Sequence, residues 1–184
     1  MKVKTSIFVL LVALFWCCNQ ASAQRTMPGR SIFTLGSHYN GSSFGAEAFF
    51  GQYVLAGYWN AGIKVSDYRT PLSTGDQLHY NHIAAAGEFM FRLVSTRRRT
   101  INLYVGAGAF AGIELVDLFH RLPSYLALPV PDKNFLYGIY GKVLAEFYLG
   151  RHFALTLEGS VPMTFPGRLG WLRWHAGIGM RITI

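Results

Sequence analysis

The chain has 184 residues, of which 51% are hydrophobic and only 14% charged, and its formal net charge is +8. Because the basic residues are scattered along the chain, apart from a run at 97–99, this balance does not predict a nucleic-acid-binding surface. After residue 24, no uncharged run is long enough for a transmembrane helix, which needs about 20 apolar residues. Abundant aromatic residues and glycine without such a run are typical of a β-barrel.

The first 23 residues have the order of a secretory signal peptide. Lys2 and Lys4 precede an apolar run at 7–15, and Ala21-Ser22-Ala23 forms a small-residue cleavage site. We therefore expect cleavage after Ala23, which leaves one domain, residues 24–184, of about 160 residues. Loss of the two signal lysines lowers the net charge from +8 to +6.

The alternative is a lipoprotein signal in which Cys17 or Cys18 is acylated. Such sites require small residues just before the cysteine, whereas Phe15 and Trp16 are bulky. Both cysteines leave with the predicted signal peptide. The mature chain then has no thiol for disulfide or thiolate chemistry.

Eight segments of the mature chain alternate between apolar and more polar residues, as strands with one lipid-facing side do. They cover residues 32–39, 44–50, 53–66, 78–93, 101–117, 135–149, 152–161 and 171–184. The clearest is 101–117, in which every odd position from Ile101 to Leu115 is apolar and the even positions are mixed. At roughly 3.3 Å per residue, such a strand is longer than the hydrocarbon core of a bilayer is thick.

The connections between these segments alternate in length. Short turns are predicted at 51–52, 95–99 and 150–151, and longer links at 67–77, 118–133 and 162–170. The first hairpin, around 40–43, lacks a long loop. An even strand number with short periplasmic turns and longer outer loops is the pattern of bacterial outer-membrane barrels. We therefore predict an all-β fold, an eight-stranded antiparallel transmembrane β-barrel of the outer membrane.

Charged residues of both signs occupy inward-facing positions of the predicted strands in equal numbers. The acidic ones are Glu47, Glu88, Glu114, Glu146 and Glu158, and the basic ones are Lys64, Arg92, Lys142, Arg173 and Arg181. Eight strands enclose a lumen that side chains fill, and charges buried there must be paired. We therefore predict a structural charge network inside the barrel, which the apolar core of a soluble sandwich would not contain.

No catalytic, cofactor-binding or metal site is predicted. His79 and His82 lack further ligands at metal spacing, and on a strand their side chains point to opposite faces. Ser160 could be drawn as a dyad with His152 or His175, but nothing in their spacing supports a hydrolase. We expect a protein that is not an enzyme.

Two glycines, Gly106 and Gly108, faintly suggest a nucleotide-binding loop. They lie in the middle of a predicted strand, without the strand–turn–helix context that such a loop requires. We interpret them as inner-face glycines that leave space for large neighbouring side chains in the lumen.

Arg97, Arg98 and Arg99 form a basic run in a predicted periplasmic turn. The simplest interpretation is a solvated hairpin tip. Arginine binds phosphate and carboxylate groups through two parallel hydrogen bonds. The alternative is therefore a contact with phosphates of outer-membrane lipids or with an acidic partner protein.

Four stretches spread over the mature chain carry a family resemblance. They are Gln24-Arg25 with Pro28-Gly29; the run GAGAFAGIE at 106–114; Phe135-Leu136-Tyr137-Gly138 leading to Glu146-Phe147-Tyr148-Leu149 and Arg151; and Gly177-x-Gly179-x-Arg181. In order and spacing they resemble the TraO family, conjugative-transposon transfer proteins of Bacteroidetes. The ending GIGMRITI also resembles the assembly signal of outer-membrane barrels, with isoleucine where that signal has aromatic residues.

The resemblance implies an outer-membrane component of a conjugative, type IV secretion-like apparatus that moves DNA between cells. Its partners would be outer-membrane lipids and other conjugation proteins. A filled eight-stranded barrel is too narrow to pass DNA, so we expect an anchor or accessory piece that does not bind nucleic acid directly. The alternative is a free-standing small outer-membrane barrel acting as an adhesin, stress protein or minor channel.

Overall fold

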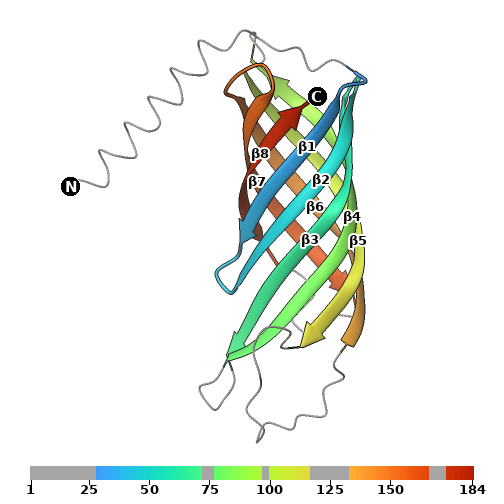
Figure 1. The fold of residues 1–184 in the computed structure, drawn as a ribbon, viewed down its shortest axis with the longest axis vertical. Helices are drawn as coiled ribbons and strands as arrows, with labels where there is room; N and C mark the ends of the chain where they lie inside the picture. The colour runs from blue at the N-terminus through green and yellow to red at the C-terminus, as the bar shows by residue number, and fades with distance from the viewer. Residues whose placement is uncertain (1–27, 72–76, 97–99, 117–132, 166–172) are drawn as a thin grey trace, which may run out of the picture.

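Eight antiparallel strands form a closed barrel in the computed structural model (Figure 1). The structure describes residues 28–71, 77–96, 100–116, 133–165 and 173–184, so the predicted signal peptide lies outside the described residues. The strands are β1 (Ser31–Tyr39), β2 (Ser43–Val54), β3 (Gly57–Pro71), β4 (Gln77–Ser95), β5 (Ile101–Val116), β6 (Lys133–Tyr148), β7 (Phe153–Phe165) and β8 (His175–Thr183). Each pairs with its sequence neighbours, and β8 pairs with β1. The predicted fold class is confirmed. The described residues contain no helix long and apolar enough to cross a membrane.

The two faces of the barrel wall differ as the alternation predicted. Large apolar side chains cover the outside; Phe44, Phe50, Ile63, Phe135 and Ile178 are 51–59% exposed. Polar and charged side chains lie on the inside and are largely buried. Lipid offers no hydrogen bonds, so a closed barrel with an apolar exterior is one of the few folds that can span it.

The turn predicted at Gly51 and Gln52 is wrong. Both residues remain in β2, where they pair with Asn60 and Trp59 of β3, and the chain turns instead at 55–56. A Cβ at position 51 would collide with the backbone carbonyl of Trp59. The glycine therefore allows close approach of two strands and does not mark a turn.

Other boundaries shift less. The last strand begins at His175 and not at residue 171, and residues 171 and 172 lie outside the described residues. β3 and β4 continue into the link predicted at 67–77, since Pro71 still pairs with Gln77. The first turn forms at 40–42 as predicted, with Gly41 at φ 86° and the Asn40 carboxamide oxygen accepting the Ser43 backbone N–H at 2.8 Å.

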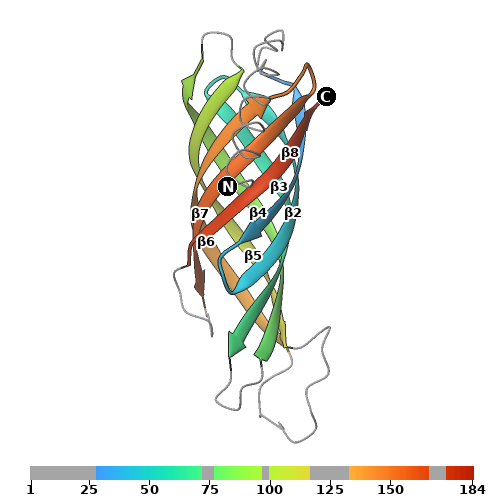
Figure 2. The ribbon, with the colours of Figure 1, turned by 90° about the vertical axis from the view of Figure 1, so that its left-hand side faces the viewer.

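The two ends of the barrel carry different connections (Figures 1 and 2). The short-turn end has the 55–56 turn and the connections 96–100 and 149–152, and the C-terminus lies there as well. The long-loop end has the 40–42 turn and the connections that contain residues 72–76, 117–132 and 166–172, which lie outside the described residues. β3 to β6 extend further toward the long-loop end than β1 and β8 do.

Candidate functional site in the barrel lumen

Five of the ten predicted lumen charges form one group, which we call the central charge cluster. It consists of Glu47, Lys64, Glu88, Lys142 and Glu158. Lys142 Nζ lies 2.8 Å from Glu158 Oε2, and it also lies 3.1 Å from Glu88 Oε2 and 3.3 Å from Glu47 Oε1. Lys64 Nζ lies 3.2 Å from Glu47 Oε2. Because the members come from five different strands, the cluster connects the barrel wall across the lumen.

Arg181 and Glu146 form a separate ion pair of 3.2 Å nearer the short-turn end, and both side chains are fully buried. Arg181 Nε also donates to Thr34 Oγ1 at 3.0 Å. The Glu146 carboxylate accepts hydrogen bonds from Tyr53 Oη at 2.9 Å and Asn102 Nδ2 at 3.1 Å. These extra bonds help to compensate both charges for their loss of water.

Four tyrosines close the lumen beside this ion pair, and we call them the tyrosine plug: Tyr53, Tyr58, Tyr104 and Tyr148. Their exposure is 3% or less. Tyr58 packs edge-on against Tyr53 and Tyr104, with ring centroids 6.0 and 5.0 Å apart. The Arg181 guanidinium lies 4.1 Å from the Tyr58 ring centroid, and Ile32, Met90 and Leu144 join the same buried cluster. At this level the lumen is packed with side chains.

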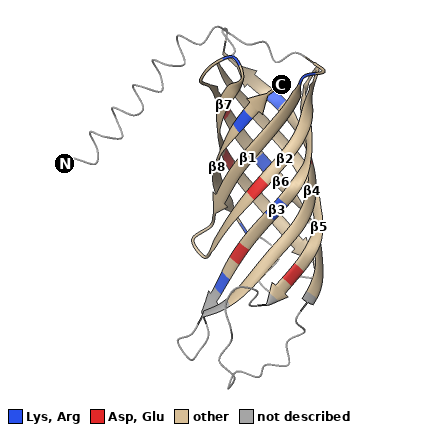
Figure 3. Ribbon diagram, viewed as in Figure 1, with Lys and Arg blue, Asp and Glu red and all other residues tan. Residues whose placement is uncertain are grey.

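The other three predicted lumen charges lie apart from these two groups. The Glu114 carboxylate is hydrogen-bonded to His82 Nε2 at 2.8 Å, so its described partner is a histidine that is not among the ten predicted lumen charges. Arg92 is opposite Tyr104 in the β4–β5 register, and the Arg173 guanidinium lies 4.9 Å from the Tyr68 ring centroid. The charges are thus distributed along the barrel (Figure 3), and the ion pairs divide into separate groups because side chains reach only near neighbours.

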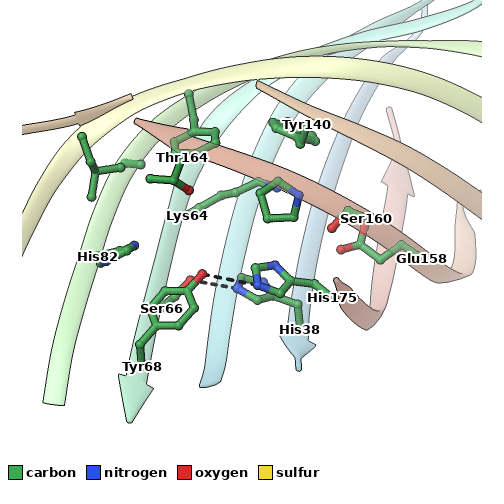
Figure 4. Close-up of a pocket in the computed structure, with 14 residues that line it drawn as sticks. His38, Lys64, Ser66, Tyr68, His82, Tyr140, Glu158, Ser160, Thr164 and His175 are labelled. Atoms are coloured by element: carbon green, nitrogen blue, oxygen red, sulfur yellow. Dashed lines mark hydrogen bonds between the residues drawn. The ribbon is translucent and has the colours of Figure 1, made fainter. Parts of the chain in front are cut away.

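The lumen contains a cavity between the central charge cluster and the long-loop end (Figure 4). It provides about 50 Å³ in which the centre of a water molecule can lie, which is room for several waters. The apolar part of the lining consists of Ala84, Phe110, Leu136 and Pro162. The polar lining consists of His38, Lys64, Ser66, Tyr68, His82, Tyr140, Glu158, Ser160, Thr164 and His175.

Three of the lining side chains are histidines, for which the sequence predicted no site role. His38 and His175 stack with ring centroids 5.0 Å apart and an interplanar angle of 15°. His38 Nε2 is hydrogen-bonded to Ser66 Oγ at 2.8 Å, and His175 Nε2 to Tyr68 Oη at 3.3 Å. The alternation of apolar and polar residues along the strands predicts that each of these histidines points into the barrel. It does not predict their convergence, because they come from different strands.

Inner-face glycines make room for the large lumen groups, as we expected for Gly108. A Cβ there would collide with the Tyr140 ring. In the same way, a Cβ at Gly177 would lie 2.8 Å from Glu158 Oε1. A glycine on one strand therefore leaves the space that a large side chain of the neighbouring strand occupies.

The described contacts do not join the residues considered above for a metal site or a hydrolytic dyad. His79 pairs with Asp67 at 3.1 Å while His82 pairs with Glu114 inside the barrel. No three His, Cys, Asp or Glu side chains in the described part of the chain converge to hold a metal ion. Ser160 is opposite His175 in the β7–β8 register, but the hydrogen bond of that ring goes to Tyr68. His152 lies at the short-turn end, bonded to the Thr183 carbonyl.

Arg97, Arg98 and Arg99 lie outside the described residues. The residues on either side belong to the short-turn end: Thr96 N donates to the Ile101 carbonyl at 3.0 Å, and Thr100 N to Thr96 Oγ1 at 3.1 Å. The contact of these arginines with lipid or protein stays a prediction.

The family model described as conjugative transposon protein TraO matches residues 25–184. No curated protein matches the sequence significantly. Among solved structures, the N-terminal β-barrel domain of Pseudomonas aeruginosa OprF has a TM-score of 0.53 at 10% identity, covering 85% of this chain and 98% of that domain. Neisserial surface protein A has a TM-score of 0.46 at 13% identity, covering 84% of this chain and 95% of its own. The Yersinia pestis attachment invasion locus protein Ail has a TM-score of 0.42 at 13% identity, covering 86% of this chain and 100% of its own. The likeness to OprF shows the fold alone.

Proposed function

The chain belongs to the TraO family of conjugative transposon proteins, and on that premise we propose that it is an outer-membrane anchor or accessory piece of a conjugative transfer apparatus. In this proposal, the barrel holds a position in the outer membrane and presents its exposed segments to other transfer proteins. This role requires no catalytic or cofactor site, and in it the barrel does not form the passage through which DNA moves.

The packed lumen is the observation that argues against a DNA conduit. The tyrosine plug and the Arg181–Glu146 pair fill the short-turn half, and Tyr58, Tyr104 and Arg181 have no exposed surface. A strand of DNA would require the removal of this whole layer. Eight strands enclose an interior just wide enough for side chains. A passage wide enough for DNA would require a barrel with more strands.

The outside of the barrel supports the anchoring role. Large apolar side chains such as Phe50, Ile63 and Ile139 are more than half exposed. Exposed apolar patches of this extent are unfavourable in water and favourable in hydrocarbon. Together with the secretory signal predicted for residues 1–23, this exterior supports the outer membrane as the membrane that the barrel enters.

The short-turn end is the face we propose for docking. The segments 24–30, 96–100 and 149–152 contain no Asp or Glu, but they contain Arg25, Arg30, Arg97, Arg98, Arg99 and Arg151. With short turns in the periplasm, this end faces the transfer proteins that lie between the two membranes. An acidic partner would meet these arginines without an Asp or Glu side chain of the same segments to repel it.

The test begins with deletion of the gene and complementation, with the frequency of transposon transfer as the readout. Arg97, Arg98 and Arg99 are then replaced together by Ser. We expect a normal level of barrel in the outer membrane, loss of co-purifying transfer proteins and reduced transfer. Arg69→Ser at the long-loop end, whose side chain is 57% exposed, is the matched control and should transfer normally.

Two results would contradict the proposal. Normal transfer by the deletion strain would favour the free-standing barrel, acting as an adhesin, stress protein or minor channel. Conductance of the purified barrel large enough for DNA would overturn the exclusion of a conduit. Normal partners and transfer in the triple Ser variant would remove the docking role of the arginine run alone.

A further inference from the structure

The central charge cluster contains more acidic groups than basic ones. Among the described residues, its ion pairs join the carboxylates of Glu47, Glu88 and Glu158 to the ammonium groups of Lys64 and Lys142. These side chains are between 1% and 18% exposed. If every carboxylate were ionised, the cluster would bury one uncompensated negative charge, which is unfavourable. Carboxylates that share one site avoid this cost when one of them keeps its proton.

The contacts of the three carboxylates differ, and the difference shows which one is the best place for a proton. Glu47 lies within hydrogen-bond distance of both lysines of the cluster, at 3.2 and 3.3 Å. Glu88 contacts one lysine and also accepts hydrogen bonds from Asn60 Nδ2 at 3.1 Å and Tyr140 Oη at 2.9 Å. Such donors stabilise the ionised form of a carboxylate. For Glu158, the described ion pair uses the one ammonium group that all three carboxylates share.

The distance of 2.8 Å from Lys142 Nζ to Glu158 Oε2 is compatible with a neutral carboxylic acid. In a carboxylic acid, one oxygen carries the proton and the other still accepts a hydrogen bond, here from the ammonium group. Glu158 is also the acid of the cluster that lines the cavity (Figure 4). A polar cavity of this size has room for water, which can take up a proton that Glu158 releases.

Titratable and charged groups of the other strands share the cluster or the cavity with Glu158. His38 and His175 bond to hydroxyl groups through Nε2, and no ion pair within the described part of the chain joins either ring to a carboxylate. The full set is His38 on β1, Glu47 on β2, Lys64 and Tyr68 on β3, His82 and Glu88 on β4, Glu114 bonded to His82 from β5, Tyr140 and Lys142 on β6, His175 on β8, and Arg173 against the Tyr68 ring.

We propose that Glu158 carries a proton at neutral pH, which balances the charges of the central cluster, and that release of this proton at higher pH makes the lumen a pH-sensitive part of the barrel. In the unfolded chain, Glu158 is ionised at neutral pH, as glutamate is in water. The folded barrel then binds one proton more than the unfolded chain, so its stability falls as the pH rises. Glu47 and Glu88 stay ionised and keep their lysine partners.

The experiment uses the full mature barrel refolded in an ester-free detergent. Infrared spectra at neutral pH should show the carbonyl band of a protonated carboxylic acid, and Glu158→Gln should remove this band. The melting temperature is then measured from about pH 7 to 9, a range in which few side chains with ordinary pKa values titrate. Because glutamine keeps the shape of the side chain and has no proton to release, Glu158→Gln should melt above the wild type, by a margin that grows with pH.

Glu146→Gln is the matched control in the other ion-pair group. It should lower the melting temperature over the whole pH range, and keep both the acid band and the fall of the melting temperature with pH. A wild-type barrel without an acid band at neutral pH would overturn the proposal, and so would an acid band that persists in Glu158→Gln. Melting of Glu158→Gln below the wild type at every pH would show that Glu158 is ionised in the folded barrel, which would also overturn it.

Discussion

The two halves of the lumen are built by the same eight strands and differ in what fills them. In the short-turn half, the tyrosine plug and the Arg181–Glu146 pair are at most 3% exposed. In the long-loop half, small inward residues such as Ser66, Ala84 and Ser160 alternate with larger ones such as Tyr68 and Phe110, and a cavity remains. The small side chains among the inward residues therefore leave a hollow in one half of a lumen that side chains otherwise fill.

The two halves therefore differ in what they contribute to the barrel. The packed half contains the buried ion pair with the most hydrogen bonds to neutral partners and blocks passage. The hollow half has polar groups around a cavity. We therefore expect substitutions in the packed half to change stability most, and substitutions in the hollow half to change it least.

The largest effect is expected for Arg181→Ala in the packed half. Removing one partner of a fully buried ion pair leaves the Glu146 carboxylate uncompensated, which costs about 3–5 kcal/mol. The free energy of unfolding in urea, followed by tryptophan fluorescence of the refolded barrel, measures it. Arg181→Met combined with Glu146→Leu should recover much of the loss, because both charges are then gone. A loss below about 1 kcal/mol for Arg181→Ala would show that the two halves do not differ as proposed.

The next effect concerns the lipid-facing wall, which both halves share. Ile178 is on the outer face of β8 and 51% exposed. Ile178→Lys should destabilise the membrane-inserted barrel by about 2–4 kcal/mol if the residue lies near the bilayer midplane. Folding into lipid vesicles, assayed by heat-modifiable mobility in gels, measures this loss. Ile178→Leu is the control, and equal folding of the two variants would argue against a lipid-facing position.

A smaller effect should separate two tyrosines of the plug. Tyr53 Oη bonds Glu146 Oε1 and Tyr148 Oη, whereas Tyr104 Oη has no hydrogen-bond partner among the described residues. Tyr53→Phe should cost about 1.5–3 kcal/mol, since it removes a bond to a charged group. Tyr104→Phe should be close to neutral because it removes an unsatisfied hydroxyl. Urea unfolding of the two variants side by side tests the difference, and an inverted order would contradict the hydrogen bonds described.

The smallest effect is expected in the hollow half. Ser66→Ala removes the 2.8 Å hydrogen bond to His38 Nε2. A bond between neutral groups contributes about 0.5–1.5 kcal/mol, and water in the cavity can replace the lost hydroxyl. The melting temperature should therefore fall less than in Tyr53→Phe. A larger fall would mean that the hollow half contributes as much to stability as the packed half.

The sequence predicted the faces of the barrel more reliably than its turns. Alternation alone placed Ile178 outside and Arg181 inside, because the side-chain period of a strand is a local property of the backbone. The turn at Gly51 was misplaced because glycine has two uses, in tight turns and where strands approach closely. Only the pairing with β3 shows which use applies to Gly51.

What the sequence determined by itself is the fold: two-residue periodicity, eight segments and alternating connection lengths require a closed barrel with a polar interior. What only the tertiary structure decided is which interior groups meet. Lys142 and Glu47 are 95 residues apart in the chain, and Glu114 pairs with a histidine and not with a lysine or arginine. These pairings depend on the register and tilt of all eight strands together, as does the cavity beside Glu158. Local periodicity carries no information about that register, because a shift by two residues leaves the pattern of faces unchanged and moves every partner.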